Sequence, residues 1–125
     1  MTLTAELVRE LAARGESPTL DYKRDDYDWS AKPANAELAK DLMAMANLLG
    51  PSAQPAHILI GVTNVGDLVG IQSKHMDDAQ LHQKVRDLLN CIPAFSYQAV
   101  DVDGLSVGVY TIVPPSSRCA QPRRH

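Results

Sequence analysis

The stretch HILIGVTNVGDLVGI, residues 57–71, decides how the rest of the chain is read. Residues 58–62 form a continuous apolar run of strand-forming residues, residues 64–67 carry a turn signal, and residues 68–71 form a second short apolar run. This pattern predicts a hairpin buried at the centre of a sheet. Gly61 interrupts the first run. Because glycine weakens a strand, it marks a bulge or a close approach by another backbone, a side chain or a ligand.

Three helices are expected around this hairpin. Residues 3–14 carry apolar side chains at helical spacing and are followed by Gly15, which suits a helix C-terminus. Residues 36–49 have the strongest helical pattern, after a polar loop at residues 24–35. Asn35 or Ser30 is the expected N-cap of that helix, and residues 77–89 form the third helix.

Two further segments have the alternating polarity of strands. Residues 19–23 predict one short strand, and residues 95–102 and 105–113 predict a second hairpin around an Asp-Gly turn. The order of elements predicts an α+β domain, in which a mixed sheet of about five strands, built on two β-hairpins, is covered by about three helices. The domain is expected to span residues 1–117, and the basic tail at 118–125 has no periodic pattern and is expected to be disordered.

Composition narrows the functional classes. The formal net charge of -3 argues against a protein that grips nucleic acid by bulk electrostatics, although a local basic face stays open. The two cysteines, Cys91 and Cys119, lack metal-ligand spacing and indicate reduced thiols in a cytoplasmic protein. No apolar run approaches the ~20 residues that span a bilayer, so no membrane partner is expected.

Glu16, Asp21 and Lys23 are the residues most suited to chemistry. Asp21 and Lys23 are two apart on the expected strand, so both project from one face, and Glu16 can fold back toward them across Pro18. Paired carboxylates bind hard divalent cations such as magnesium, and a neighbouring lysine contacts phosphate or stabilises negative charge. The alternative is a solvated Asp-Lys pair on a surface strand.

Several motifs in a fixed order resemble the Schlafen/AlbA-like DNA-binding domain family of bacteria. They are Glu16-x-x-x-x-Asp21-Tyr22-Lys23, the helix segment DLMAMAN at 41–47, ILIGV at 58–62, Gly66, VGI at 69–71 and VGVYTIVPPS at 107–116. The resemblance covers nearly the whole chain. It implies an α+β module that binds nucleic acid and that often belongs to transcriptional regulators or helicase-like proteins.

The resemblance also implies a site. Nucleases among the Schlafens use two carboxylates at the spacing of Glu16 and Asp21, and a third carboxylate after the central strand. Here Asn64 stands at that third position and is neutral. The loss of one negative charge lowers the expected affinity for a cation, which depends on the charge of its oxygen ligands.

The first hypothesis is therefore a non-enzymatic module whose binding to DNA or RNA is weak and salt-sensitive and needs no cofactor. Its phosphate contacts are expected among the basic residues Lys23, Arg24, Lys32, Lys40, Arg118, Arg123 and Arg124. The alternative is an endoribonuclease dependent on magnesium or manganese, with Glu16 and Asp21 as catalytic and metal-binding residues and Asp67 in place of the third ligand. A third hypothesis is an interaction module that forms a homodimer through the edge of the second hairpin.

Overall fold

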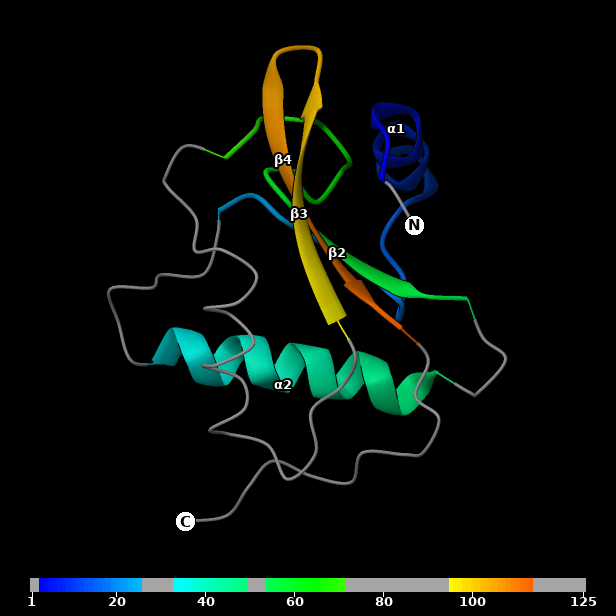
Figure 1. Ribbon diagram of the computed structural model, residues 1–125, viewed down its shortest axis with the longest axis vertical. Coiled ribbons are helices and arrows are strands. Elements are labelled where there is room, and N and C mark those ends of the chain that lie inside the picture. The colour runs from blue at the N-terminus through cyan, green and yellow to red at the C-terminus, as the bar shows by residue number, and fades with distance from the viewer. Residues whose placement is uncertain (1–2, 26–32, 50–53, 72–94, 114–125) are drawn as a thin grey trace. The chain divides into compact units, whose positions relative to one another are not determined.

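The computed structural model describes residues 3–25, 33–49, 54–71 and 95–113. These ranges contain two helices and four strands in the order α1, β1, α2, β2, β3, β4 (Figure 1). The chain divides into two compact units. The first contains α1, β1, most of β2 and most of the β3 and β4 strands, and the second contains α2.

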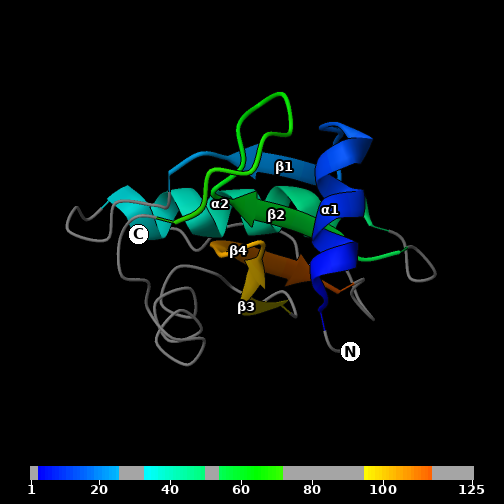
Figure 2. The ribbon, with the colours of Figure 1, turned by 90° about the horizontal axis from the view of Figure 1, so that it is seen from above.

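The four strands form one sheet in the order β1-β2-β4-β3, which Figure 2 shows from above. The strands are β1 (Leu20–Lys23), β2 (Ala56–Ile60), β3 (Phe95–Val102) and β4 (Leu105–Ile112). β1 and β2 are parallel, with Leu20 opposite His57 and Lys23 opposite Ile60. Parallel neighbours need a long connection, and α2 (Pro33–Leu48) lies in the sequence between them. β3 and β4 form a hairpin, so the sheet is mixed and the α+β class is confirmed.

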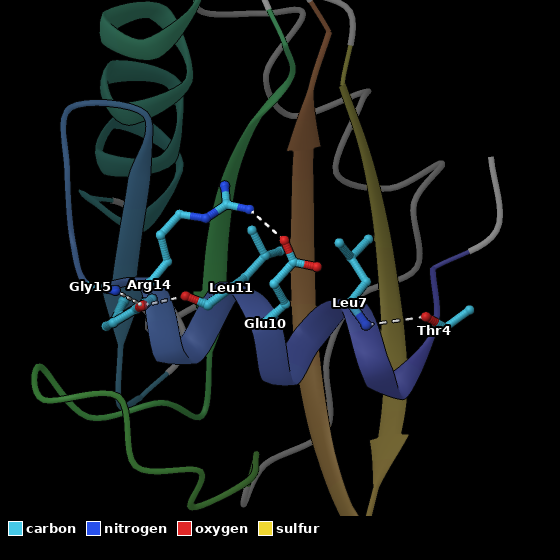
Figure 3. Close-up of polar contacts among 7 residues, drawn as sticks. Thr4, Leu7, Glu10, Leu11, Arg14 and Gly15 are labelled. Atoms are coloured by element: carbon cyan, nitrogen blue, oxygen red, sulfur yellow. Dashed lines mark hydrogen bonds and ion pairs between the residues drawn. The ribbon is translucent and has the colours of Figure 1, made fainter.

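The helix α1 (Ala5–Arg14) is capped at its start by Thr4 and ends at Gly15. The hydroxyl of Thr4 accepts a hydrogen bond from the amide of Leu7 at 3.1 Å (Figure 3). Gly15 ends the helix with a φ of +90°, a conformation that L side chains disfavour. The Thr4 cap satisfies one of the amides at the start of the helix that have no partner within it.

One face of α1 packs on one face of the sheet. The buried residues of this core come from both: Leu3, Val8, Leu11 and Ala12 from α1 and the residues before it, and Leu20, Tyr22, Leu59, Val62, Val100, Val102, Val107 and Val109 from the sheet and the residue after β2. Arg9 on the exposed side of α1 forms an ion pair with Asp103 in the hairpin turn, at 2.8 Å. All of these core residues except Tyr22 are aliphatic.

The second hairpin agrees with its prediction. β3 spans the predicted residues, and β4 ends one residue earlier than expected. Asp103 and Gly104 in the turn have φ values of +53° and +84°. Positive φ at both central residues matches the twist of the strands that such a turn joins, which is why Asp-Gly is favoured there.

The prediction of a hairpin at residues 57–71 is wrong for its second strand. Residues 68–71 form no strand, and only an isolated bridge joins Val62 to Leu68. The carbonyl of Gly61 accepts hydrogen bonds from the amides of both Val69 and Gly70, at 2.8 and 3.0 Å, so the regular alternation of a ladder stops there. The described sheet therefore has four strands rather than about five.

Gly61 does mark a close approach, and its neighbour is a backbone. Its φ is +91°, and a Cβ atom at this position would lie 2.8 Å from the carbonyl carbon of Gly70. No side chain other than hydrogen fits between these two backbones without a shift.

The second helix begins earlier than predicted. α2 starts at Pro33, so Asn35 lies inside the helix and is not its N-cap. Proline suits the first helical position, because its missing amide would have no helical partner and its φ is already helical. The predicted helix at 77–89, the alternative cap Ser30 and the tail at 118–125 lie outside the described residues. Neither described helix is long and apolar enough to cross a bilayer.

Candidate functional site

The strand β1 places Asp21 and Lys23 on the face opposite to α1. Leu20 and Tyr22 are buried in the core, and the two charged side chains alternate with them. The parallel register sets Asp21 beside Ile58 and Lys23 beside Ile60, both fully buried. Asp21 and Lys23 are therefore partly removed from water, with side chains 34% and 31% exposed.

Glu16 lies in the connector before β1, and the chain turns back after it. Ser17 and Leu20 exchange backbone hydrogen bonds at 2.9 and 3.1 Å across the intervening Pro18. This turn brings the Glu16 carboxylate to the amide of Tyr22, from which it accepts a hydrogen bond at 3.2 Å. The same carboxyl group is hydrogen-bonded to that of Asp21. The expected meeting of Glu16, Asp21 and Lys23 is thus present.

The pKa of Asp21 is raised from its ordinary value of 3.8. Burial is the largest cause, because it disfavours the charged form, and the hydrogen bond with Glu16 is the second. The Lys23 ammonium, 3.4 Å from Oδ2 of Asp21, opposes the shift without cancelling it. Asp21 therefore holds a proton more readily than an aspartate in water does.

The carboxylate pair does not fit a divalent cation well. Within the part of the chain that the structure describes, no group of three or more His, Cys, Asp and Glu side chains could hold a metal ion. Asp67 therefore does not complete the set begun by Glu16 and Asp21. The Lys23 ammonium is already paired with Asp21 and supplies positive charge where a cation would have to bind.

The turn at residues 63–67 begins directly beside β1. The carbonyl of Lys23 accepts hydrogen bonds from the amides of Gly61 and Val62, at 2.7 and 3.2 Å. Asn64, the residue at the third carboxylate position, is exposed in this turn, and so is Asp67. The structure thus ties the base of the turn to the strand that carries Asp21.

On the face of β1 that packs against α1, contacts of Tyr22 and Gly66 attach β1 and the 63–67 turn to the C-terminal end of α1. The Tyr22 hydroxyl donates a hydrogen bond to the carbonyl of Leu11 and accepts one from the amide of Gly15 at 3.0 Å, at the end of α1 shown in Figure 3. Gly66 packs against the same helix end, since a Cβ there would lie 2.3 Å from the carbonyl oxygen of Ala12. Sequence reasoning did not identify these contacts.

The predicted phosphate contacts are only partly described. Lys23 is half-buried beside Asp21, Arg24 is exposed after β1, and Lys40 is exposed on α2 in the second unit. The remaining predicted contacts, Lys32, Arg118, Arg123 and Arg124, lie outside the described residues. Lys23 is therefore the predicted contact that adjoins the carboxyl groups, and Arg24 follows it directly in the sequence.

Comparison with known proteins gives a family and a fold. The sequence profile of the family described as Schlafen, AlbA_2 matches residues 16–124. No curated protein matches the sequence.

Two solved structures resemble this one at low sequence identity. The crystal structure of the DIP2311 protein from Corynebacterium diphtheriae has 17% identity and a TM-score of 0.57, and the match covers 92% of this chain and 22% of that one. The N-terminal domain of a RecG-related protein from Nitrosomonas europaea has 18% identity and a TM-score of 0.49, over 93% of this chain and 76% of that one. The chain therefore spans about a fifth of the length of the DIP2311 protein, with which it shares its fold.

Proposed function

Because the chain belongs to the Schlafen, AlbA_2 family, we propose that it is a nucleic-acid-binding domain that contacts phosphates through Lys23 and Arg24 and catalyses no reaction. The observation that carries this proposal is the position of two basic residues in succession at the end of β1, where Lys23 is half-buried and Arg24 is exposed. A backbone phosphate is the anion that a domain of this family would meet.

The local charge explains why binding should be weak. Glu16 and Asp21 oppose the approach of a phosphate, and the whole chain carries a formal charge of -3. Lys23 and Arg24 can neutralise about two phosphates between them, so the affinity depends on few released counterions. We therefore propose weak binding that decreases as salt is added, in a domain that takes part in gene regulation or in a helicase-like protein.

The test is a titration by fluorescence anisotropy against single- and double-stranded DNA and RNA, at about 50 mM and about 200 mM salt. Lys23→Gln and Arg24→Gln should each weaken binding to every nucleic acid and reduce the salt dependence by about one released counterion. Arg9→Gln is the matched control, because it removes the same charge from an exposed site on α1 where Arg9 is already paired with Asp103. Absence of binding at the lower salt concentration would overturn the proposal.

A metal-dependent endoribonuclease is the alternative, favoured by the contact between the Glu16 and Asp21 carboxyl groups and opposed by the poor fit of a cation described above. Incubation of transfer RNA with magnesium or manganese separates the two functions. Cleavage that Asp21→Ala abolishes would establish the enzyme. Equal residual cleavage by the wild type and Asp21→Ala would identify a contaminant and support a domain without catalysis.

A further inference from the structure

The turn at residues 63–67 is held in one conformation by its own hydrogen bonds. The amide of Thr63 donates to the carbonyl of Asp67, and the amide of Gly66 donates to the carbonyl of Thr63, both at 2.9 Å. The Thr63 hydroxyl accepts from the amide of Asp67 at 3.0 Å. A turn that is ordered before binding loses little conformational entropy when it makes a contact.

The tip of this ordered turn is exposed. Val65 is 75% exposed, the largest value among the exposed large hydrophobic residues of the described chain, and Asn64 beside it is exposed as well. The folded chain therefore presents an amide and an apolar side chain to solvent on a rigid support. A single exposed valine is common on protein surfaces, and what sets this one apart is the fixed turn beneath it.

Two attachments fix the direction of the turn relative to the rest of the first unit. Gly66 approaches the carbonyl of Ala12 so closely that only glycine fits. At the base, the carbonyl of Lys23 binds the amides of Gly61 and Val62. The turn is thus attached both to β1, the strand that carries Lys23, and to the C-terminal end of α1.

The chemistry of the tip suits base edges better than phosphates. Residues 63–67 contain no lysine or arginine, and the Asp67 carboxylate would repel a phosphate. An asparagine amide can donate to and accept from adenine in the major groove, and an apolar side chain can contact the methyl group of thymine.

We propose that the 63–67 turn is the base-contacting element of this domain and that Asn64 and Val65 give it a preference for A·T base pairs in duplex DNA. This inference rests on the proposed nucleic-acid-binding function and assigns different tasks to neighbouring residues. Lys23 and Arg24 contribute affinity for any sequence, and the turn contributes the choice between sequences.

The experiment compares three duplexes of equal length: one rich in A·T pairs, one rich in G·C pairs, and the A·T-rich duplex with uracil in place of thymine. The wild type should prefer the A·T-rich duplex, and Asn64→Ala should reduce that preference by about 5-fold or more. Val65→Ala should reduce the discrimination between thymine and uracil. Lys23→Gln should weaken binding to all three duplexes by the same factor, and it is the control for general affinity.

The possible results separate the two proposals. If the wild type binds the A·T-rich and G·C-rich duplexes equally, or if Asn64→Ala and Val65→Ala keep the preference of the wild type, the inference about the turn is wrong and the binding function stands. If the wild type binds no nucleic acid at low salt, the proposed function fails, and the inference fails with it. Circular dichroism of the two turn variants, whose replaced side chains are exposed, should match the wild type and so exclude unfolding as the cause.

Discussion

The hydroxyl of Tyr22 donates a hydrogen bond to the carbonyl of Leu11, and through it the strand β1 holds the C-terminal end of α1. The same hydroxyl accepts from the amide of Gly15, so one side chain satisfies two backbone groups. Tyr22→Phe keeps the ring in the core and leaves both groups without this partner. We expect the free energy of unfolding to fall by about 1–3 kcal/mol, measured by urea denaturation. An unchanged value would show that other groups or water replace the hydroxyl.

Gly66 is expected to tolerate no side chain. Gly66→Ala would place a Cβ 2.3 Å from the Ala12 carbonyl oxygen at a φ of +93°. Gly104→Ala is the matched control, because its φ is +84° and no atom lies within 4 Å of the added Cβ. The control should lose about 1–2 kcal/mol from the positive φ alone, and Gly66→Ala should lose clearly more because it adds the clash. Equal losses in thermal or urea unfolding would contradict the close packing of the turn on α1.

The N-terminal cap of α1 depends on the Thr4 hydroxyl. Thr4→Ala removes the acceptor for the Leu7 amide and should lower the free energy of unfolding by about 1 kcal/mol. Thr4→Ser retains the hydroxyl and should remain close to the wild type. If the two variants unfold alike, the cap does not contribute to stability.

The raised pKa of Asp21 makes stability fall as the pH rises. Between the ordinary value of 3.8 and the raised pKa, the folded state binds more protons than the unfolded state, so the free energy of unfolding decreases with pH across that range. Asp21→Asn keeps a hydrogen-bond donor toward Glu16 and has no proton to lose. The difference in stability between the variant and the wild type should therefore grow in favour of the variant as the pH rises through this range. A series of urea titrations checks the sign, and a difference that shrinks with pH would contradict it.

His57 should have the opposite effect to Asp21, because it makes the free energy of unfolding increase as the pH rises. Burial, and secondarily the charge of Arg14, lowers the pKa of His57 below 6.5. The unfolded state then binds more protons, so the stability contributed by neutral His57 is present above 6.5 and is lost as the pH falls through the range down to the lowered pKa. A titration followed by NMR should give a pKa below 6.5 for the resonance that His57→Gln removes. Arg14→Gln should raise that pKa slightly, and no change would show that burial acts alone.

Local signals in the sequence predicted those parts of the fold that depend on neighbours along the chain. The alternation in residues 95–102 and the Asp-Gly turn determine the hairpin within a few residues, and it was predicted nearly to its ends. Pro33 shows the limit of such signals. Residues 24–35 were predicted to be a loop, although proline is favourable at the first position of a helix, where α2 begins. Residues 68–71 show another limit. Their apolar pattern suits a strand, but the amides of Val69 and Gly70 both donate to the carbonyl of Gly61, so these residues do not form the regular hydrogen-bond ladder of a fifth strand.

The contacts of the candidate site also fall into two kinds: those between residues close in the sequence, which could be predicted, and those between separate elements, which could not. The approach of Glu16 to Asp21 follows from a short turn across Pro18, and the sequence predicted it. The contact of Gly66 with Ala12 and the bonds of the Tyr22 hydroxyl join residues from separate elements, and only packing brings them together. The positive φ of Gly66 leaves no signal in the sequence beyond a glycine in a turn.

The packing of α1 on Val100, Val102, Val107 and Val109 has a consequence for how the chain folds. α1 is synthesised before β3 and β4, which supply much of its core, and its ion pair joins Arg9 to Asp103, 94 positions later in the chain. The helix must therefore wait, with its apolar face uncovered, until the hairpin has been synthesised. Such long-range contacts slow folding and give chaperones and proteases time to act on the nascent chain.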